Sequence, residues 1–154
     1  MIRIAYEGTA HASSQVKPGK EWRLAAFDGL GMGSVPGWGG TSLPASVWFH
    51  FSKPHRLAKI AFSSFSNIYA PIHFRVVGSS DCANWTTLLD VKDTDFAGNN
   101  DPANVKNDRS GVERFWTIPK KNRRKFPCIG LIVTEAWRWR GVSVRGMKMW
   151  EEII

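Results

Sequence analysis

The spacing of the apolar residues is what most constrains the fold of this chain. No stretch of three helical turns carries apolar side chains at intervals of three and four residues, as an amphipathic helix would. The chain instead contains short runs rich in Val, Ile, Phe, Trp and Thr, separated by Gly, Pro, Ser, Asn and Asp. This pattern predicts an all-β sandwich or barrel with many turns.

Individual runs give the expected strands, which are 2–6, 47–51, 57–65, 72–78, 85–91, 112–118, 126–134 and 142–150. The run 126–134 is nearly all apolar, so we expect a central strand that is covered on both faces. In the last run the apolar phase slips from Val142 and Val144 to Met147 and Met149. A slip of one residue reverses the faces of a strand, so the sequence predicts a β-bulge at Arg145 and Gly146.

The segments between these runs are predicted to be turns and loops. Residues 21–27 are expected to form a short helical turn, and the glycines and prolines of 30–44 exclude a regular element. Residues 52–55 read as a turn between two strands. The polar segment 92–111 is long for a loop in a compact domain, so it is expected to be a surface excursion.

Length and charge restrict the functional class. At 154 residues the chain is expected to be a single domain, 1–154, and no apolar run approaches the roughly 20 residues of a membrane span. The first residues lack the apolar centre of a signal peptide, so the chain is either cytosolic or part of a longer protein. The net charge of +8 favours anionic partners, although solubility alone would also explain it. Two cysteines, Cys82 and Cys128, exclude a disulfide-dense scaffold and leave a single bridge open.

Several motifs follow one another in a characteristic order. Ala12-Ser13-Ser14 comes first, then Ala25-Ala26-Phe27-Asp28-Gly29 with a loop leading to Trp38, and then a strand, a Lys-Pro turn and a returning strand over 47–60. They are followed by Phe74-Arg75-Val76-Val77-Gly78-Ser79-Ser80-Asp81-Cys82-Ala83-Asn84-Trp85, and by an ending with Trp137, Arg145 and Trp150. In this order they resemble the discoidin domain, or coagulation factor 5/8 C-terminal type domain. That resemblance implies a galactose-binding-like jelly-roll β-sandwich, with Cys82 standing where the family usually has glycine.

The sharpest candidate site is Trp137-Arg138-Trp139-Arg140, which precedes the last predicted strand. If this segment is extended, both indoles lie on one side and both guanidiniums on the other. An indole face stacks on a pyranose ring, and a guanidinium donates paired hydrogen bonds to hydroxyl, carboxylate or sulfate oxygens. The alternative is that one tryptophan closes the end of the core. The resemblance implies that Tyr69 and Trp38 join this end, Trp38 being the weaker candidate because it packs inward in relatives.

A calcium ion is a second expectation carried by the resemblance. In some sugar-binding relatives an aspartate, loop carbonyls and a glutamate of the last strand hold calcium beneath the loop that here contains Asp28. Gly146 stands where that glutamate would fall, and the nearest acids, Glu151 and Glu152, lie beyond it. The alternative is that Asp28 only caps its turn.

No catalytic motif is present, so we expect a non-catalytic binding module that requires no cofactor. A glycan is the first expected ligand, and relatives suggest a homo-oligomer or repeated domains. Peripheral binding to anionic phospholipid through Phe65 and Ile68 is an alternative, as is protein-protein interaction or adhesion. Nucleic acid ranks last, because the aromatics form no evident platform along a basic groove. The basic turn 120–125 reads either as a site for sulfated glycan or anionic lipid or as a solvated turn. The tryptophans on or beside strands are expected in the core: Trp22, Trp48, Trp85, Trp116 and Trp150.

Overall fold

The structure, a computed structural model, describes residues 1–14, 23–30, 38–64, 70–92, 113–136 and 142–152. Within these ranges no helix has the length and apolar character needed to cross a membrane. The strands are β1 (Ile2–Arg3), β2 (Gly8–Ala12), β3 (Trp38–Gly40), β4 (Ala45–Ser63), β5 (Pro71–Ser79), β6 (Thr86–Val91), β7 (Arg114–Thr117), β8 (Lys125–Ala136) and β9 (Val142–Glu151). A 3-10 turn, Lys120–Asn122, precedes β8. The chain is therefore all-β, as predicted.

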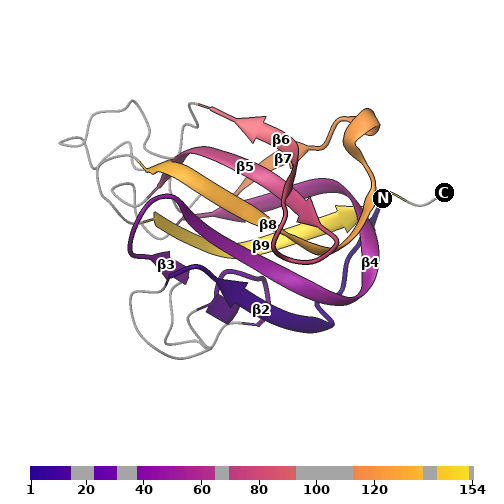
Figure 1. Cartoon of the computed structure of the whole chain (residues 1–154), viewed down its shortest axis with the longest axis horizontal. Helices are drawn as coiled ribbons and strands as arrows, with labels where there is room; N and C mark the ends of the chain where they lie inside the picture. The colour runs from indigo at the N-terminus through magenta and orange to yellow at the C-terminus, as the bar shows by residue number, and fades with distance from the viewer. Residues whose placement is uncertain (15–22, 31–37, 65–69, 93–112, 137–141, 153–154) are drawn as a thin grey trace.

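The strands form two antiparallel layers that share β4 (Figure 1). The first layer has the order β2-β4-β8-β5-β6, with β8 at its centre. In the second layer β9 and β7 lie on the two sides of β4, and β1 and β3 add to β9. This is a jelly-roll β-sandwich, and β8 is the central strand that its apolar sequence predicted.

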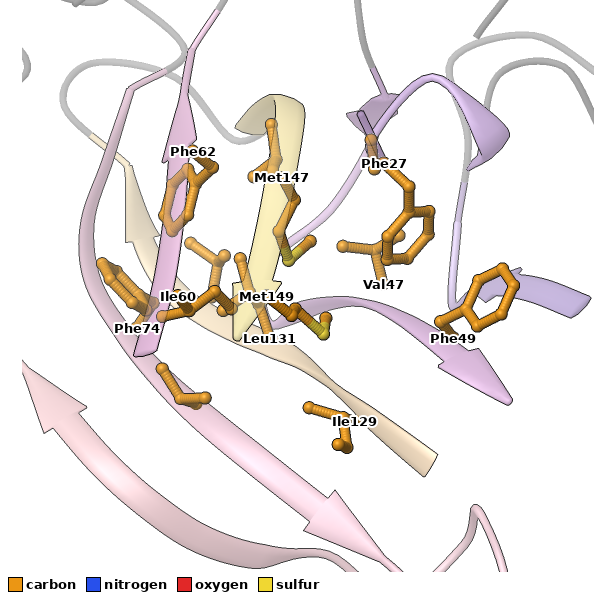
Figure 2. Close-up of a cluster of buried hydrophobic side chains, with 14 of the residues drawn as sticks. Phe27, Val47, Phe49, Ile60, Phe62, Phe74, Ile129, Leu131, Met147 and Met149 are labelled. Carbon is orange, nitrogen blue, oxygen red and sulfur yellow. The ribbon is translucent and has the colours of Figure 1, made fainter. Parts of the chain in front are cut away.

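The core lies between the two layers (Figure 2). Strand alternation supplies it, because every second side chain of a strand points to the same face. The second layer contributes Ile60, Phe62 and Met149, which are all fully buried. They face apolar side chains of β8 and β5, among them Leu131 and Phe74 (Figure 2).

Strand β4 differs from the prediction, which placed a turn at 52–55 between two strands. Its 19 residues form one continuous strand that passes from the first layer into the second. The register with β8 shifts between His50 and His55, where Pro54 has no N–H to donate to a ladder. The backbone stays extended there because another segment of the same chain supplies a partner: the Ser52 N–H donates to the Glu7 carbonyl at 2.8 Å.

The β-bulge in β9 is confirmed. Ala61 pairs with Lys148 and Ser63 with Arg145, so β9 contains one more residue than β4 between the two pairs. Gly146 lies in this interval with φ +63°, a conformation that favours glycine. The bulge therefore keeps Val144 and Met147 on the same buried side of the strand despite their odd spacing.

Two short strands lie where no strand was expected. Strand β2 pairs with the first half of β4, and β3 pairs with β9 inside the segment that was predicted to be loop. The first strand is shorter than expected, although the Ile4 N–H still donates to the Met149 carbonyl at 2.9 Å. Short runs with glycine carry too few apolar residues to show a strand period.

The core assignment of the strand tryptophans was correct only in part. Trp48, Trp85, Trp116 and Trp150 are all half-buried, and Trp22 lies outside the described residues. Trp116 packs against the core, with its ring centroid 4.9 Å from that of Phe62 and 5.0 Å from that of Phe74. Trp48, Trp85 and Trp150 are not among the described residues that form or line the core. Trp48, for example, stacks on His11 at 5.5 Å between ring centroids and meets Trp85 edge-on at 5.4 Å.

Cys82 and Cys128 form a disulfide, with their Cα atoms 5.5 Å apart. Cys82 lies in the turn between β5 and β6 with φ +59°, and it is the only described residue other than glycine with a positive φ. Such a conformation costs a residue with a Cβ atom and suits glycine. This geometry agrees with the glycine that the discoidin resemblance implies at this position.

Candidate functional site

The segment with the candidate residues Trp137, Arg138, Trp139 and Arg140 lies outside the described residues, as does Tyr69. Its two attachment points are described: β8 ends at Ala136 and β9 begins at Val142. Pairing places Pro71, the first residue of β5, opposite Ala136. Pairing also places Gly40, the last residue of β3, opposite Val142. We call this end of the sandwich, marked by Gly40, Pro71, Ala136 and Val142, the loop end.

Strand directions bring the attachment points of several segments to the loop end. The segment 65–69 connects β4 with β5, whose first residue lies beside Ala136. The segment 31–37 leads into β3 at Trp38, opposite Val144, and β3 then reaches the loop end at Gly40, opposite Val142. The last residue of β6, Val91, pairs with Phe74 near the start of β5, so the segment 93–112 also departs from this end (Figure 1). The predicted clustering of the loops therefore agrees with where the described strands begin and end.

The described rim of the loop end is polar. His73 and Arg75 point outward from β5, and the His73 imidazole lies 2.8 Å from a carboxylate oxygen of Asp90 on β6. The Thr134 hydroxyl donates to the His73 carbonyl at 3.2 Å. Sequence reasoning missed this group, although the alternation of polar residues at 73 and 75 was the signal that could have revealed it.

Trp38 does not present its ring to a ligand. It is fully buried, and its indole N–H donates to the Ser14 carbonyl at 2.9 Å. Its backbone pairs with Val144 of β9, which holds the ring in the core below the loop end. The inclusion of Trp38 among the binding residues is therefore corrected to a structural role, in line with its inward packing in relatives.

Asp28 lies in a turn that is fastened to the bulge of β9. Its N–H donates to the Met147 carbonyl at 3.0 Å, and the Met147 N–H donates to the Ala26 carbonyl at 2.8 Å. The hydroxyl of Tyr6 donates to the same Met147 carbonyl. Burial raises the pKa of Tyr6 well above its usual range, so the hydroxyl stays protonated and keeps donating.

The described surroundings of Asp28 do not fit a calcium ion, which takes six to eight oxygen ligands. The Asp28 carboxylate forms an ion pair with the Arg3 guanidinium at 3.0 Å. The guanidinium is itself a cation, and it stands where calcium would need further oxygen ligands. The Met147 carbonyl already accepts two hydrogen bonds. The acids nearest in sequence to Gly146 of β9 contact other side chains: Glu151 contacts His55 at 2.8 Å, and Glu152 contacts Arg123 at 3.3 Å.

The basic turn 120–125 lies at the opposite end of the sandwich. Lys125 begins β8 and Ala136 ends it, and a strand of 12 residues spans about 35 Å. Arg123 is buried, and its Nε donates to the Ile118 carbonyl at 2.8 Å, so this residue has a structural role. The turn therefore cannot contribute cations to a ligand held at the loop end.

The sequence matches no protein-family model and no curated protein. Solved structures do match across the whole chain. The family 32 carbohydrate-binding module of AlyQ, in complex with 4,5-unsaturated mannuronic acid, superposes with a TM-score of 0.71 at 10% identity. That match covers 99% of this chain and 100% of the module.

Two further modules agree with this match. A pectin-binding carbohydrate-binding module has a TM-score of 0.68 at 13% identity, with 97% of this chain and 94% of that chain covered. The family 32 module of NanJ from Clostridium perfringens, in complex with galactose, has a TM-score of 0.65 at 14% identity, with 92% and 91% covered. This chain therefore has the fold of the family 32 carbohydrate-binding modules, the galactose-binding-like jelly roll that the discoidin resemblance implied.

Proposed function

We propose that this chain is a non-catalytic carbohydrate-binding module whose glycan site lies at the loop end. The observation that carries the proposal is the strand pairing there: Ala136 opposite Pro71, and Val142 opposite Gly40. These pairs anchor the segment with Trp137 and Trp139 on four rigid strands. Recognition residues on short segments between rigid strands are a common layout of binding sites.

The residue types in this segment suit a sugar. Trp137 or Trp139 would stack on the apolar face of a pyranose ring, and Arg138 and Arg140 would donate hydrogen bonds to its oxygens. Tyr69 would add a hydroxyl from the neighbouring segment. The net charge of +8 favours a glycan that carries carboxylate or sulfate groups. Of the three similar modules, one is in complex with 4,5-unsaturated mannuronic acid, one binds pectin, and one is in complex with galactose, which is neutral.

A glycan array with the intact chain tests the proposal, followed by titration of the best ligand. A single site of this kind binds weakly, so the protein is displayed multivalently on the array. We expect Trp139→Ala or Trp137→Ala to weaken binding by roughly tenfold or more, the usual loss at a binding hot spot. Phe115→Ala is the matched control, because Phe115 is an exposed aromatic, 54% accessible, on β7 outside the loop end.

Two outcomes would refute the glycan proposal: no glycan bound at all, or binding that neither tryptophan substitution changes. Anionic lipid is distinguished by liposome sedimentation. Binding that requires phosphatidylserine and is indifferent to free monosaccharide would indicate a membrane-binding module. Capture of a partner protein that neither sugar nor lipid competes away would indicate an interaction or adhesion domain. Sedimentation velocity, which measures the oligomeric state, tests the expected homo-oligomer.

A further inference from the structure

Three potential metal ligands meet on the outer face of the first layer, away from the loop end. They are an imidazole nitrogen of His50 and the sulfurs of Cys82 and Cys128, and the three atoms lie within 4.8 Å of one another. Among the described residues no other group of three or more histidines, cysteines and acids is close enough to hold an ion. We call these three residues the cysteine–histidine group.

Strand register creates this group. His50 of β4 pairs directly with Cys128 of β8, so their side chains leave the layer on the same face. Ser79, the last residue of β5, pairs with Cys128 from the other side. The turn that follows then folds back and brings Cys82 over Cys128. The arrangement therefore rests on backbone pairing and does not depend on the sulfur–sulfur bond alone.

The turn that carries Cys82 is held by its own hydrogen bonds. The Asp81 carboxylate accepts from the N–H groups of Asn84 at 2.8 Å and Ala83 at 2.9 Å, and from the Ser79 hydroxyl at 2.9 Å. These bonds fasten the carboxylate to the backbone of the turn and keep the turn closed. We expect Cys82 to stay beside Cys128 when the disulfide is opened.

We propose that, after reduction of the disulfide, the cysteine–histidine group binds a zinc ion through two thiolates and one imidazole. Reduction of the disulfide to two thiols takes two electrons and two protons: a dithiol supplies both and becomes a disulfide, whereas a phosphine supplies the electrons and becomes a phosphine oxide with the oxygen of a water molecule, which gives the protons. Binding of Zn²⁺ then releases both protons, because the ligands are thiolates. Sulfur and imidazole nitrogen are the donors that zinc prefers, and three protein ligands leave a fourth position for water.

The surroundings of the group suit this cation. His50 is exposed, Cys82 is half-buried and Cys128 is fully buried, so the ion would enter from the His50 side. The Asp81 carboxylate adjoins Cys82 in sequence. The imidazole of His11 lies nearby, with its ring centroid 6.5 Å from that of His50.

Cobalt and zinc titrations of the intact chain test this site, which is independent of the glycan proposal. The protein is reduced anaerobically with a phosphine, and circular dichroism establishes that the sheet persists. We expect Co²⁺ to produce thiolate-to-metal absorption with one ion per chain, and Zn²⁺ to displace it. The oxidised protein should give no such absorption, because a disulfide offers no thiolate.

Variants separate this site from adventitious binding. Cys82→Ser should abolish the cobalt absorption, and His50→Ala should weaken Zn²⁺ binding by roughly tenfold or more through loss of a ligand. His73→Ala is the matched control, since His73 lies on β5 beside Asp90 and should leave the affinity unchanged. Loss of the sheet on reduction would overturn the proposal. Absence of cobalt absorption in the folded reduced protein, or equal zinc affinity in His50→Ala and the unmodified protein, would also overturn it.

Discussion

Cys82 adopts a backbone conformation that normally belongs to glycine, and its disulfide compensates for that cost. A residue with a Cβ atom at φ +59° is destabilised by about 1–2 kcal/mol relative to glycine. The bridge to Cys128 spans 46 positions of sequence, for which the chain-entropy relation gives about 4 kcal/mol of stabilisation. The native pair should therefore gain net stability although Cys82 is strained.

Two double variants isolate the backbone cost. Cys82→Gly/Cys128→Ala and Cys82→Ala/Cys128→Ala both lack the bridge and leave the same space at position 128, so they differ only in the Cβ atom at position 82. Glycine gains about 1–2 kcal/mol from the favourable φ and loses about 0.4–1 kcal/mol through the flexibility of its unfolded chain. We expect the glycine variant to be more stable by about 1 kcal/mol, which is roughly 2–4 °C in Tm for a chain of this size.

Thermal and urea unfolding, followed by circular dichroism and tryptophan fluorescence, measure this difference. Ala83→Gly in the unmodified protein is the control, because Ala83 lies in the same turn and has no positive φ. There the same exchange should lower the free energy of unfolding by about 0.4–1 kcal/mol. An alanine variant at position 82 that equals or exceeds the glycine variant in stability would refute the reasoning.

Three further predictions concern packing, pH and calcium. Gly130→Ala should lower the free energy of unfolding by about 3 kcal/mol, the upper end for overpacking, because the added Cβ would lie 2.6 Å from the Cα of Trp48. Gly146→Ala should lower it by only about 1 kcal/mol, because the added Cβ would meet nothing within 4 Å and the cost comes from the φ of +63°. Equal losses for the two variants in urea unfolding would contradict this. The hydrogen bonds to Asp81 lower its pKa in the folded protein. Their stabilisation is therefore fully present above the unfolded pKa of about 3.9 and is lost as the pH falls through the lower folded pKa. The difference in unfolding free energy between the unmodified protein and Asp81→Asn should shrink below about pH 4, and a difference that stays constant would argue against this role. Because Arg3 engages Asp28, millimolar calcium should leave Tm unchanged, whereas a calcium-dependent rise that Asp28→Ala abolishes would restore the calcium site.

Period and phase allowed the sequence to predict much of this fold. The apolar run in β8 identified the central strand, and the slip between Val144 and Met147 located the bulge, because both features are local and strictly periodic. The continuity of β4 through Pro54 escaped prediction, since it depends on partners such as Glu7 that are distant in sequence. Strand β3 escaped because Gly39 and Gly40 erase any period.

Side-chain burial was harder to predict than strand position. Trp38 and Trp48 are equally apolar in sequence, yet one ring is fully buried and the other is half-buried. The difference depends on which face the partner strand covers, which a single sequence does not reveal. For the loop end, the sequence indicated which residue types could bind a ligand. The strand pairing then showed where the segments that carry these residues are attached. The His50–Cys82–Cys128 proximity depended on register and could not be inferred from spacing.

β9 is the last strand of the sandwich in chain order, which has a consequence for the order of folding during synthesis. Strand β9 pairs with β1, β3 and β4, all of which leave the ribosome long before it. The second layer therefore lacks this strand until β9 itself has emerged, and the core side chains that β9 covers stay exposed until then. The sandwich completes its folding only after β9 has been synthesised, and transiently exposed apolar surface of this kind favours aggregation.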